Sequence, residues 1–90
     1  MKLSDEKRKK ISEYILSTLY EKYPESLFTS QIANEIARDE EFTKLLLTEL
    51  KSNELVTPIT KNSKGIDYLR RVKWRLSNKA HKILSNNYSH

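Results

Sequence analysis

Hydrophobic positions in the first quarter of the chain repeat at helical spacing. Ile11, Ile15 and Leu19 recur every four residues, and Ser4 stands ahead of them where a helix N-cap belongs. Pro24 ends the pattern, because the residue before a proline is driven out of the α region. The pattern therefore predicts one amphipathic helix that ends just before this proline.

The same helix carries apolar side chains outside its main stripe, namely Leu16, Tyr20 and Tyr23. A single small core rarely needs so much apolar surface on one helix. Two interpretations remain open. Either these side chains are half-buried at the rim of the core, or they contact a second copy of the chain.

Two shorter helices are predicted in the middle of the chain. Leu27 and Phe28 form a short apolar link that can add an edge to a small sheet, and Thr29 is expected to cap the helix that follows. Residues 38–41 are expected to form a turn. The next helix places four apolar side chains on one buried face, Phe42, Leu46, Leu47 and Leu50. Asn53 is expected to end it in the left-handed conformation that Asn tolerates.

A β-hairpin is predicted next. Two β-type runs, 53–60 and 68–77, flank a turn that contains the only glycine of the chain. Pro58 cannot donate to a ladder, which marks the first strand as having an open side. The second run alternates apolar side chains with cations, Val72, Trp74 and Leu76 with Arg71, Lys73 and Arg75. The apolar set is expected to face the core and the cations to face water.

A last helix is predicted after the hairpin. Ser77 is placed to cap it, and Ala80, Ile83 and Leu84 give it an apolar side. Residues 85–90 are polar and are expected to fray.

Composition bounds the class of protein. Ninety residues predict a single domain, 1–90, with an ordered core over about residues 5–84. The longest apolar run, residues 45–47, is far too short to span a membrane. The charged start from Lys2 to Lys10 is not a secretory signal, and the absence of cysteine excludes disulfides. A cytoplasmic protein, intracellular and not secreted, is expected.

Charge is distributed unevenly along the chain. The net charge is +5 and the sequence pI is about 9.5. Residues 61–90 hold eight Lys or Arg against one acid, a net of +7, whereas residues 23–60 hold three against seven, a net of −4. A basic hairpin behind an acidic helical segment indicates a surface that meets a polyanion.

The order of the predicted elements resembles the winged helix-turn-helix domains of bacterial and archaeal transcription regulators. Three stretches carry the likeness: residues 28–33 at the entry to the second helix, residues 46–56 where the recognition helix runs into the wing, and residues 74–84 at the exit into the last helix. The resemblance implies a mostly helical α+β fold, with a three-helix core, a β-hairpin wing and a C-terminal helix. It also implies a small regulator that binds duplex DNA.

Candidate DNA contacts follow from the charge clustering and from this resemblance. The hairpin cations expected to hold phosphates are Lys61, Lys64, Arg71, Lys73 and Arg75. Arg70 is expected to turn toward the apolar side of its strand instead. The resemblance adds outward positions of the recognition helix, Thr43, Lys44, Thr48 and Lys51. It also adds the basic start of the first helix, Lys7, Arg8 and Lys10.

Two departures from the family pattern weaken base reading. The turn before the recognition helix has no glycine, and this helix begins with three acids, Asp39, Glu40 and Glu41, that repel phosphates. Its outward positions include no Arg, Asn or Gln for bidentate contacts with base edges. Leu45 is expected to project from this helix into solvent.

Two other functions stay open. The acidic turn with Leu45 could form the contact face of a protein adaptor, or the basic hairpin could bind structured RNA, as on a ribosomal surface. The sequence pattern supports neither an enzyme nor a metal-binding protein. His81 and His90 lack further ligands at metal spacing, and no glycine-rich loop exists to cradle a phosphate. No cofactor, metal or membrane partner is expected, and a homodimer is allowed.

Overall fold

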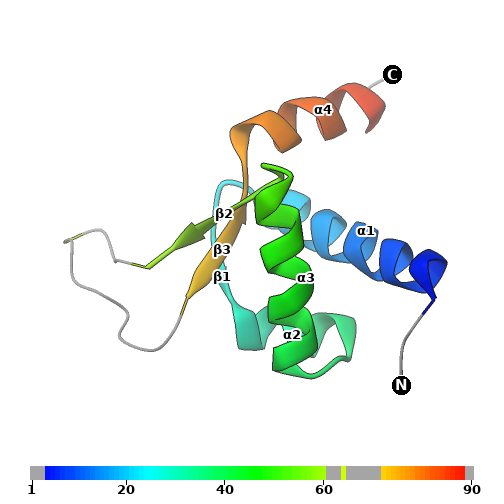
Figure 1. Ribbon diagram of the computed structural model, residues 1–90. Coiled ribbons are helices and arrows are strands. Elements are labelled where there is room, and N and C mark those ends of the chain that lie inside the picture. The colour runs from blue at the N-terminus through cyan, green and yellow to red at the C-terminus, as the bar shows by residue number, and fades with distance from the viewer. Residues whose placement is uncertain (1–3, 61–63, 65–71, 89–90) are drawn as a thin grey trace.

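The computed structural model describes residues 4–60, 64 and 72–88. The predictions for Lys61, Arg70, Arg71 and most of the hairpin turn lie outside these residues. The elements, in order, are α1 (Asp5–Lys22), β1 (Leu27–Phe28), α2 (Thr29–Ile36), α3 (Glu40–Ser52), β2 (Val56–Ile59), β3 (Lys73–Leu76) and α4 (Asn78–Tyr88), as Figure 1 shows.

Helix α1 begins and ends where the sequence predicts. The Ser4 hydroxyl accepts a hydrogen bond from the backbone N–H of Lys7 at 3.3 Å, and Asp5 and Glu6 occupy the first turn, where the helix dipole favours anions. The helix ends at Lys22, just ahead of the proline.

The expected cap of α2 is wrong by one position. Thr29 is the first helical residue, and its neighbour Phe28 holds the N-cap position, donating its backbone N–H to the Gln31 side chain at 2.8 Å. The Thr29 hydroxyl is buried instead against β3, where it accepts from the Trp74 indole N–H at 2.8 Å and donates to the Val72 carbonyl at 3.4 Å. A buried indole N–H needs an acceptor, and this tertiary need determines the role of the hydroxyl.

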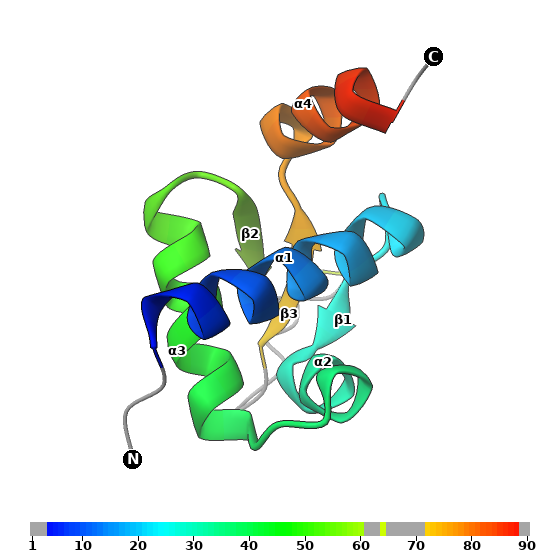
Figure 2. The same ribbon diagram turned by 90° about the vertical axis from the view of Figure 1, so that its right-hand side faces the viewer.

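Helix α3 follows α2 through a tight turn that contains no glycine. Ala37 adopts the left-handed conformation there, with φ 56°, and Asp39 caps α3 by accepting from the Phe42 N–H at 2.7 Å. At the other end the prediction for Asn53 is wrong, because its φ is −91° and the left-handed residue is Glu54, with φ 62°. Helices α2 and α3 pack against one another, and Figure 2 shows α1 crossing in front of the sheet.

The sheet is small and antiparallel, in the order β1-β3-β2. In the register, Leu27 and Pro58 both lie opposite Trp74, and Val56 lies opposite Leu76. Strand β2 is thus an edge strand, which explains how it tolerates a proline. The alternation of β3 is confirmed, since Trp74 and Leu76 are buried and the two cations of the strand are less so.

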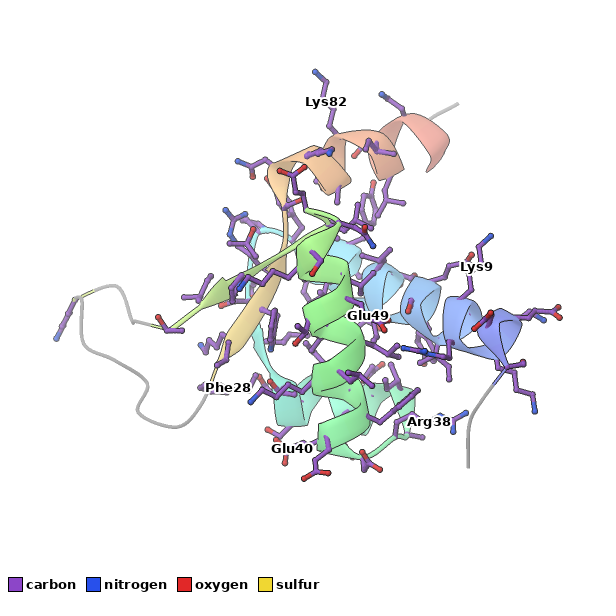
Figure 3. All side chains as sticks on the ribbon, viewed as in Figure 1. Lys9, Phe28, Arg38, Glu40, Glu49 and Lys82 are labelled. Atoms are coloured by element: carbon purple, nitrogen blue, oxygen red, sulfur yellow. The ribbon has the colours of Figure 1, made fainter. Side chains whose placement is uncertain are left out.

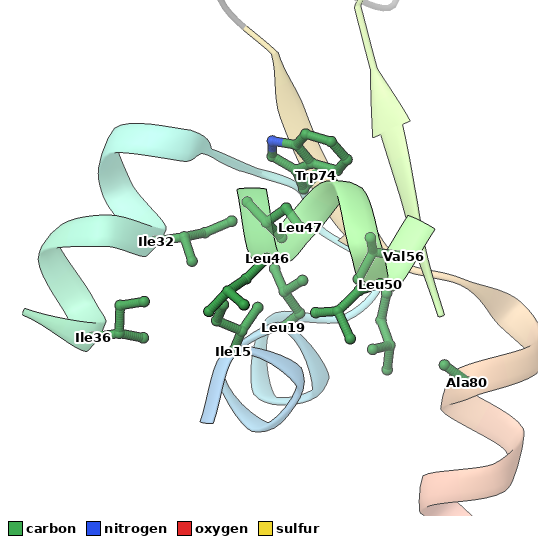
Figure 4. Close-up of a cluster of buried hydrophobic side chains, with 11 residues drawn as sticks. Ile15, Leu19, Ile32, Ile36, Leu46, Leu47, Leu50, Val56, Trp74 and Ala80 are labelled. Carbon is green, nitrogen blue, oxygen red and sulfur yellow. The ribbon is translucent and has the colours of Figure 1, made fainter. Parts of the chain in front are cut away.

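The core lies between α1, α2, α3 and the sheet (Figure 4). The predicted stripes supply it: Ile15 and Leu19 from α1, Ile32 and Ile36 from α2, Leu46, Leu47 and Leu50 from α3, and Trp74 and Leu76 from β3. Phe42 packs against this cluster from its edge.

Helix α4 leaves β3 at the end of the molecule opposite α2 (Figure 1). The Ser77 hydroxyl accepts from the Ala80 N–H at 2.9 Å, which confirms the predicted cap. The helix continues to Tyr88, past the point where fraying is expected. Ala80 is buried, but Ile83, expected on the apolar side, is 46% exposed.

Candidate nucleic-acid interface

The outward face of α3 differs from the predicted one at its first position. Thr43 is 0% exposed, and its hydroxyl donates to the Asp39 carbonyl at 2.7 Å. It lies one helical turn ahead of Leu46 and Leu47 on the buried face, since positions three and four apart share a side of a helix. The prediction that Thr43 faces outward is therefore wrong, and this residue cannot contact a base.

The remaining outward positions of α3 are exposed, with Leu45 at 52%. Thr48 and Ser52 both turn their hydroxyls back onto the helix. Thr48 donates to the Lys44 carbonyl at 2.8 Å, and Ser52 donates to the Thr48 carbonyl at 3.1 Å. The donors of these two hydroxyls are therefore already occupied within α3.

A shallow hollow of about 250 Å³ lies between the start of α3 and the base of the hairpin. Its lining comes from β1, α2, α3 and the residue before β3: Phe28, Thr29, Ser30, Glu40, Glu41, Lys44 and Val72. Figure 3 shows Glu40 at the start of α3 and Phe28 near the start of β3. The hollow combines two carboxylates and one cation, so it does not present a simple phosphate pocket.

The cations of β3 are less exposed to water than the strand pattern predicts. The Lys73 ammonium lies 4.8 Å from the centre of the Phe28 ring, and Phe28 also lines the hollow beside Lys44. Arg75 turns toward α4, donating to the Leu76 carbonyl at 3.2 Å and to the Asn78 side chain at 3.3 Å. Both cations are half-buried, because β3 is the central strand and neighbouring strands flank its side chains. Lys64 is exposed.

The basic start of α1 is partly used within the chain. Arg8 forms an ion pair with Glu49 of α3, and Lys10 lies 4.0 Å from the Glu6 carboxylate on its own helix. Lys7 is exposed. Sequence reasoning missed the pair of Arg8 with Glu49, since these residues are 41 positions apart and no local pattern links them.

The α1 side chains considered for a dimer contact are half-buried and packed against the core, as the first of the two interpretations expects. Their neighbour is α4 of the same chain. Tyr23 donates its hydroxyl to Asn78 at 2.6 Å, Tyr20 shares a hydrogen bond with Ser85 at 3.3 Å, and the His81 ring stacks on both tyrosines, with ring centroids 3.9 Å from Tyr23 and 5.3 Å from Tyr20. The sequence did not indicate this role of His81.

Two further properties concern only the described part of the chain. Among residues 4–60, 64 and 72–88, no group of three or more His, Asp or Glu side chains is placed to hold a metal ion. None of the helices in these ranges has the length and apolar character that crossing a membrane requires.

Comparison with known proteins gives structural matches alone. No family model matches the sequence, and no curated protein matches it. Among solved structures, the chain is similar to a MepR–DNA complex from S. aureus, with a TM-score of 0.75 and 20% identity over 88% of this chain and 60% of that one.

Two further solved structures support the same fold. S. aureus MepR, described as a transcription regulator of the multidrug efflux pump MepA, aligns with a TM-score of 0.70 and 22% identity over 88% of this chain and 54% of its own. Lactococcus lactis ZitR, described as a zinc-responsive MarR family member, aligns with a TM-score of 0.67 and 22% identity over 100% of this chain and 54% of its own. The chain thus spans little more than half the length of these neighbours. The chain has the winged helix-turn-helix fold, as the order of elements predicted.

Proposed function

We propose that this chain binds duplex DNA as part of a small intracellular transcription regulator, in a binding role without catalysis. The observation that carries the proposal is the placement of two cations near Phe28, where the recognition helix of a winged fold adjoins its basic hairpin. Lys44 lines the same hollow as Phe28, and the Lys73 ammonium lies over the Phe28 ring. The DNA complex of MepR supports the proposal, because it contains the same fold bound to DNA.

The proposed contacts form two groups. The hairpin and the adjacent edge of α3 hold phosphates through Lys61, Lys64, Arg71, Lys73, Lys44 and Lys51. Lys7 and Lys10 add contacts from the start of α1. Arg75 and Arg8 already bind partners within the chain, so they contribute less to phosphate binding than these lysines and Arg71. Phosphate contacts supply most of the affinity in such an arrangement and carry no sequence information themselves.

A salt titration of binding to random-sequence duplex DNA tests this proposal. For a protein that neutralises phosphates, the logarithm of the binding constant falls linearly with the logarithm of the salt concentration. The slope is about 0.9 for each phosphate that is neutralised. The triple variant Lys64→Gln/Arg71→Gln/Lys73→Gln is expected to bind more weakly to every sequence and to show a shallower slope.

A matched control removes three cations elsewhere, in Lys9→Gln/Lys22→Gln/Lys82→Gln. Figure 3 shows Lys9 and Lys82 on α1 and α4, at a distance from the hairpin base. Equal losses in the two triple variants would reject the hairpin as the contact, since only net charge would then matter. Mass measured on the same samples establishes whether the chain is a homodimer.

The other two functions give different results in the same assay. Tighter binding of structured RNA than of duplex DNA in competition would indicate an RNA-binding protein. Undetectable duplex binding at low salt, together with a stable complex with another protein, would indicate an adaptor.

A further inference from the structure

We infer that the outward face of α3 selects A·T base pairs, with Leu45 contacting the 5-methyl group of thymine in the major groove. The inference rests on the proposed DNA binding and deepens it, because it assigns a sequence preference to a helix that lacks the usual base-reading side chains.

Leu45 is the main apolar group on this face. It is one of three large hydrophobic side chains of the described residues that stand well exposed, and the other two, Tyr14 and Ile83, lie on α1 and α4. Its neighbours Leu46 and Leu47 are fully buried, whereas Leu45 itself takes no part in the core. An exposed leucine on the helix that a winged fold directs at the major groove is placed to meet apolar groups of base edges.

The polar groups around Leu45 are acceptors rather than donors. The hydroxyls of Thr48 and Ser52 donate their hydrogen bonds to carbonyls of α3, which leaves only oxygen lone pairs facing outward. Glu41, one turn before Leu45, is exposed and adds a carboxylate. Guanine presents two acceptors in the major groove and would leave these oxygens without a partner.

Charge is arranged along the two flanks of the face. Lys44 and Lys51 lie on one side, roughly 100° or more around the helix from Leu45, which suits them to phosphates at the groove edge. Glu49 lies on the other side, where Arg8 neutralises its carboxylate. The centre of the face therefore offers an apolar group and acceptors, with two lysines on one flank and the Arg8–Glu49 ion pair on the other.

An A·T pair is the one base pair whose major-groove edge matches both properties. Thymine supplies the methyl group, and adenine supplies an amino donor for the outward oxygens. A G·C pair also supplies an amino donor, on cytosine, but it carries no methyl group. The preference between the two pairs therefore depends on the contact with Leu45.

Removing the methyl group alone tests the inference. Two alternating duplexes, poly(dA-dT) and poly(dA-dU), have the same hydrogen-bonding edges and differ at thymine C5. We expect the wild-type chain to bind the thymine duplex about 3- to 5-fold more tightly for each methyl group that it contacts, as the burial of one methyl group implies. A G·C duplex with 5-methylcytosine should likewise bind more tightly than its unmethylated counterpart.

Two variants assign the effect to the side chain. Leu45→Ala is expected to bring the thymine-to-uracil ratio close to one, while the matched change Ile83→Ala on α4 leaves the ratio unchanged. Both positions are exposed, so both variants are expected to fold. A ratio that survives in Leu45→Ala would come from duplex shape and would overturn the inference.

Failure of this inference can be told apart from failure of the proposed function. Equal, salt-dependent affinity of the wild type for the two duplexes rejects the thymine contact and leaves DNA binding intact. No binding to either duplex rejects both. Capture of a protein partner that depends on Leu45, without duplex binding, rejects both in favour of an adaptor.

Discussion

At the scale of single residues, Ala37 is held in a conformation that suits another amino acid better. It is the left-handed residue that ends α2, with φ 56°, and its N–H bonds back to the Ala33 and Asn34 carbonyls. A Cβ atom at positive φ costs roughly 1 to 2 kcal/mol, which explains why glycine is the usual residue at such a helix end. The tight turn is nevertheless kept, because α2 and α3 are both packed on the core.

We therefore expect Ala37→Gly to stabilise the fold. Relief of the left-handed strain outweighs the extra backbone entropy of glycine, for a net gain of about 0.5 to 1 kcal/mol in the free energy of unfolding. Urea unfolding measures it as a higher midpoint. As a control, Glu35→Gly at an exposed position in the last turn of the same helix should lower the stability by about 0.5 kcal/mol. A lower midpoint for Ala37→Gly would show that the strain is absent.

Single residues also show where sequence reasoning succeeds. The caps at Ser4 and Ser77 could be predicted, because each hydroxyl bonds a backbone N–H three positions along. The positions of Thr29 and Thr43 could not be predicted, since the local pattern assigned Thr29 to a helix cap and Thr43 to the outward face of α3. The first is held by Trp74, a partner 45 positions away, and the second is covered by the core.

At the scale of elements, the pair of Arg8 with Glu49 joins α1 to the outward side of α3. Both side chains are partly exposed, so the pair contributes little stability, in the range of about 0 to 1 kcal/mol. The pair matters for the charge of the α3 surface rather than for the stability of the fold. It neutralises one carboxylate on the helix that faces DNA in the proposed complex.

A double-mutant cycle separates this effect from direct phosphate contact. If Arg8 acts by neutralising Glu49, Arg8→Gln should weaken duplex binding in the wild type and have little effect in a Glu49→Gln background. If Arg8 contacts a phosphate itself, the loss of affinity should be the same in both backgrounds. Equilibrium binding to one random-sequence duplex at low salt measures all four proteins of the cycle.

Element types and their order were largely predictable from the sequence, because apolar periodicity and caps are local properties. The alternation of β3 and the buried face of α3 are confirmed in this way. Contacts between elements were less predictable. The stacking of His81 on Tyr20 and Tyr23 and the position of Lys73 over Phe28 depend on how α4 and β1 are placed, which no periodicity encodes.

At the scale of the whole molecule, acids and cations lie close together at the hollow. Glu40 and Glu41 line it together with Lys44, and Lys73 lies over the ring of Phe28, another of its lining residues. In the proposed complex these two acids lie near the phosphates that the cations attract. Long-range repulsion by them is expected to limit affinity, and salt should screen it.

The double variant Glu40→Gln/Glu41→Gln is therefore expected to bind duplex DNA more tightly than the wild type at low salt. The gain should shrink as the salt concentration rises, because the Debye length falls below about 10 Å above 0.1 M. Binding isotherms at several salt concentrations measure it. Glu13→Gln/Glu21→Gln on α1 makes the same change of net charge and should give a smaller gain. Equal gains would mean that the position of the acids does not matter.

The overall architecture could be read from the order of elements, whereas the site could be read only in part. Charge clustering identified the hairpin as the basic region, but it could not show that Arg75 turns to α4 or that Arg8 is paired. Those outcomes depend on distances between side chains that only the folded chain defines.

The hydrogen bond between Trp74 and Thr29 has one more consequence, a spectroscopic one. Trp74 is the only tryptophan of the chain and is 4% exposed in the core at the base of the hairpin. Its fluorescence should shift to longer wavelength on unfolding and change little when a ligand meets the surface of α3. The chain therefore carries its own optical reporter of folding. A variant that loses DNA binding while keeping the native emission has lost a contact, and one that loses both has lost its fold.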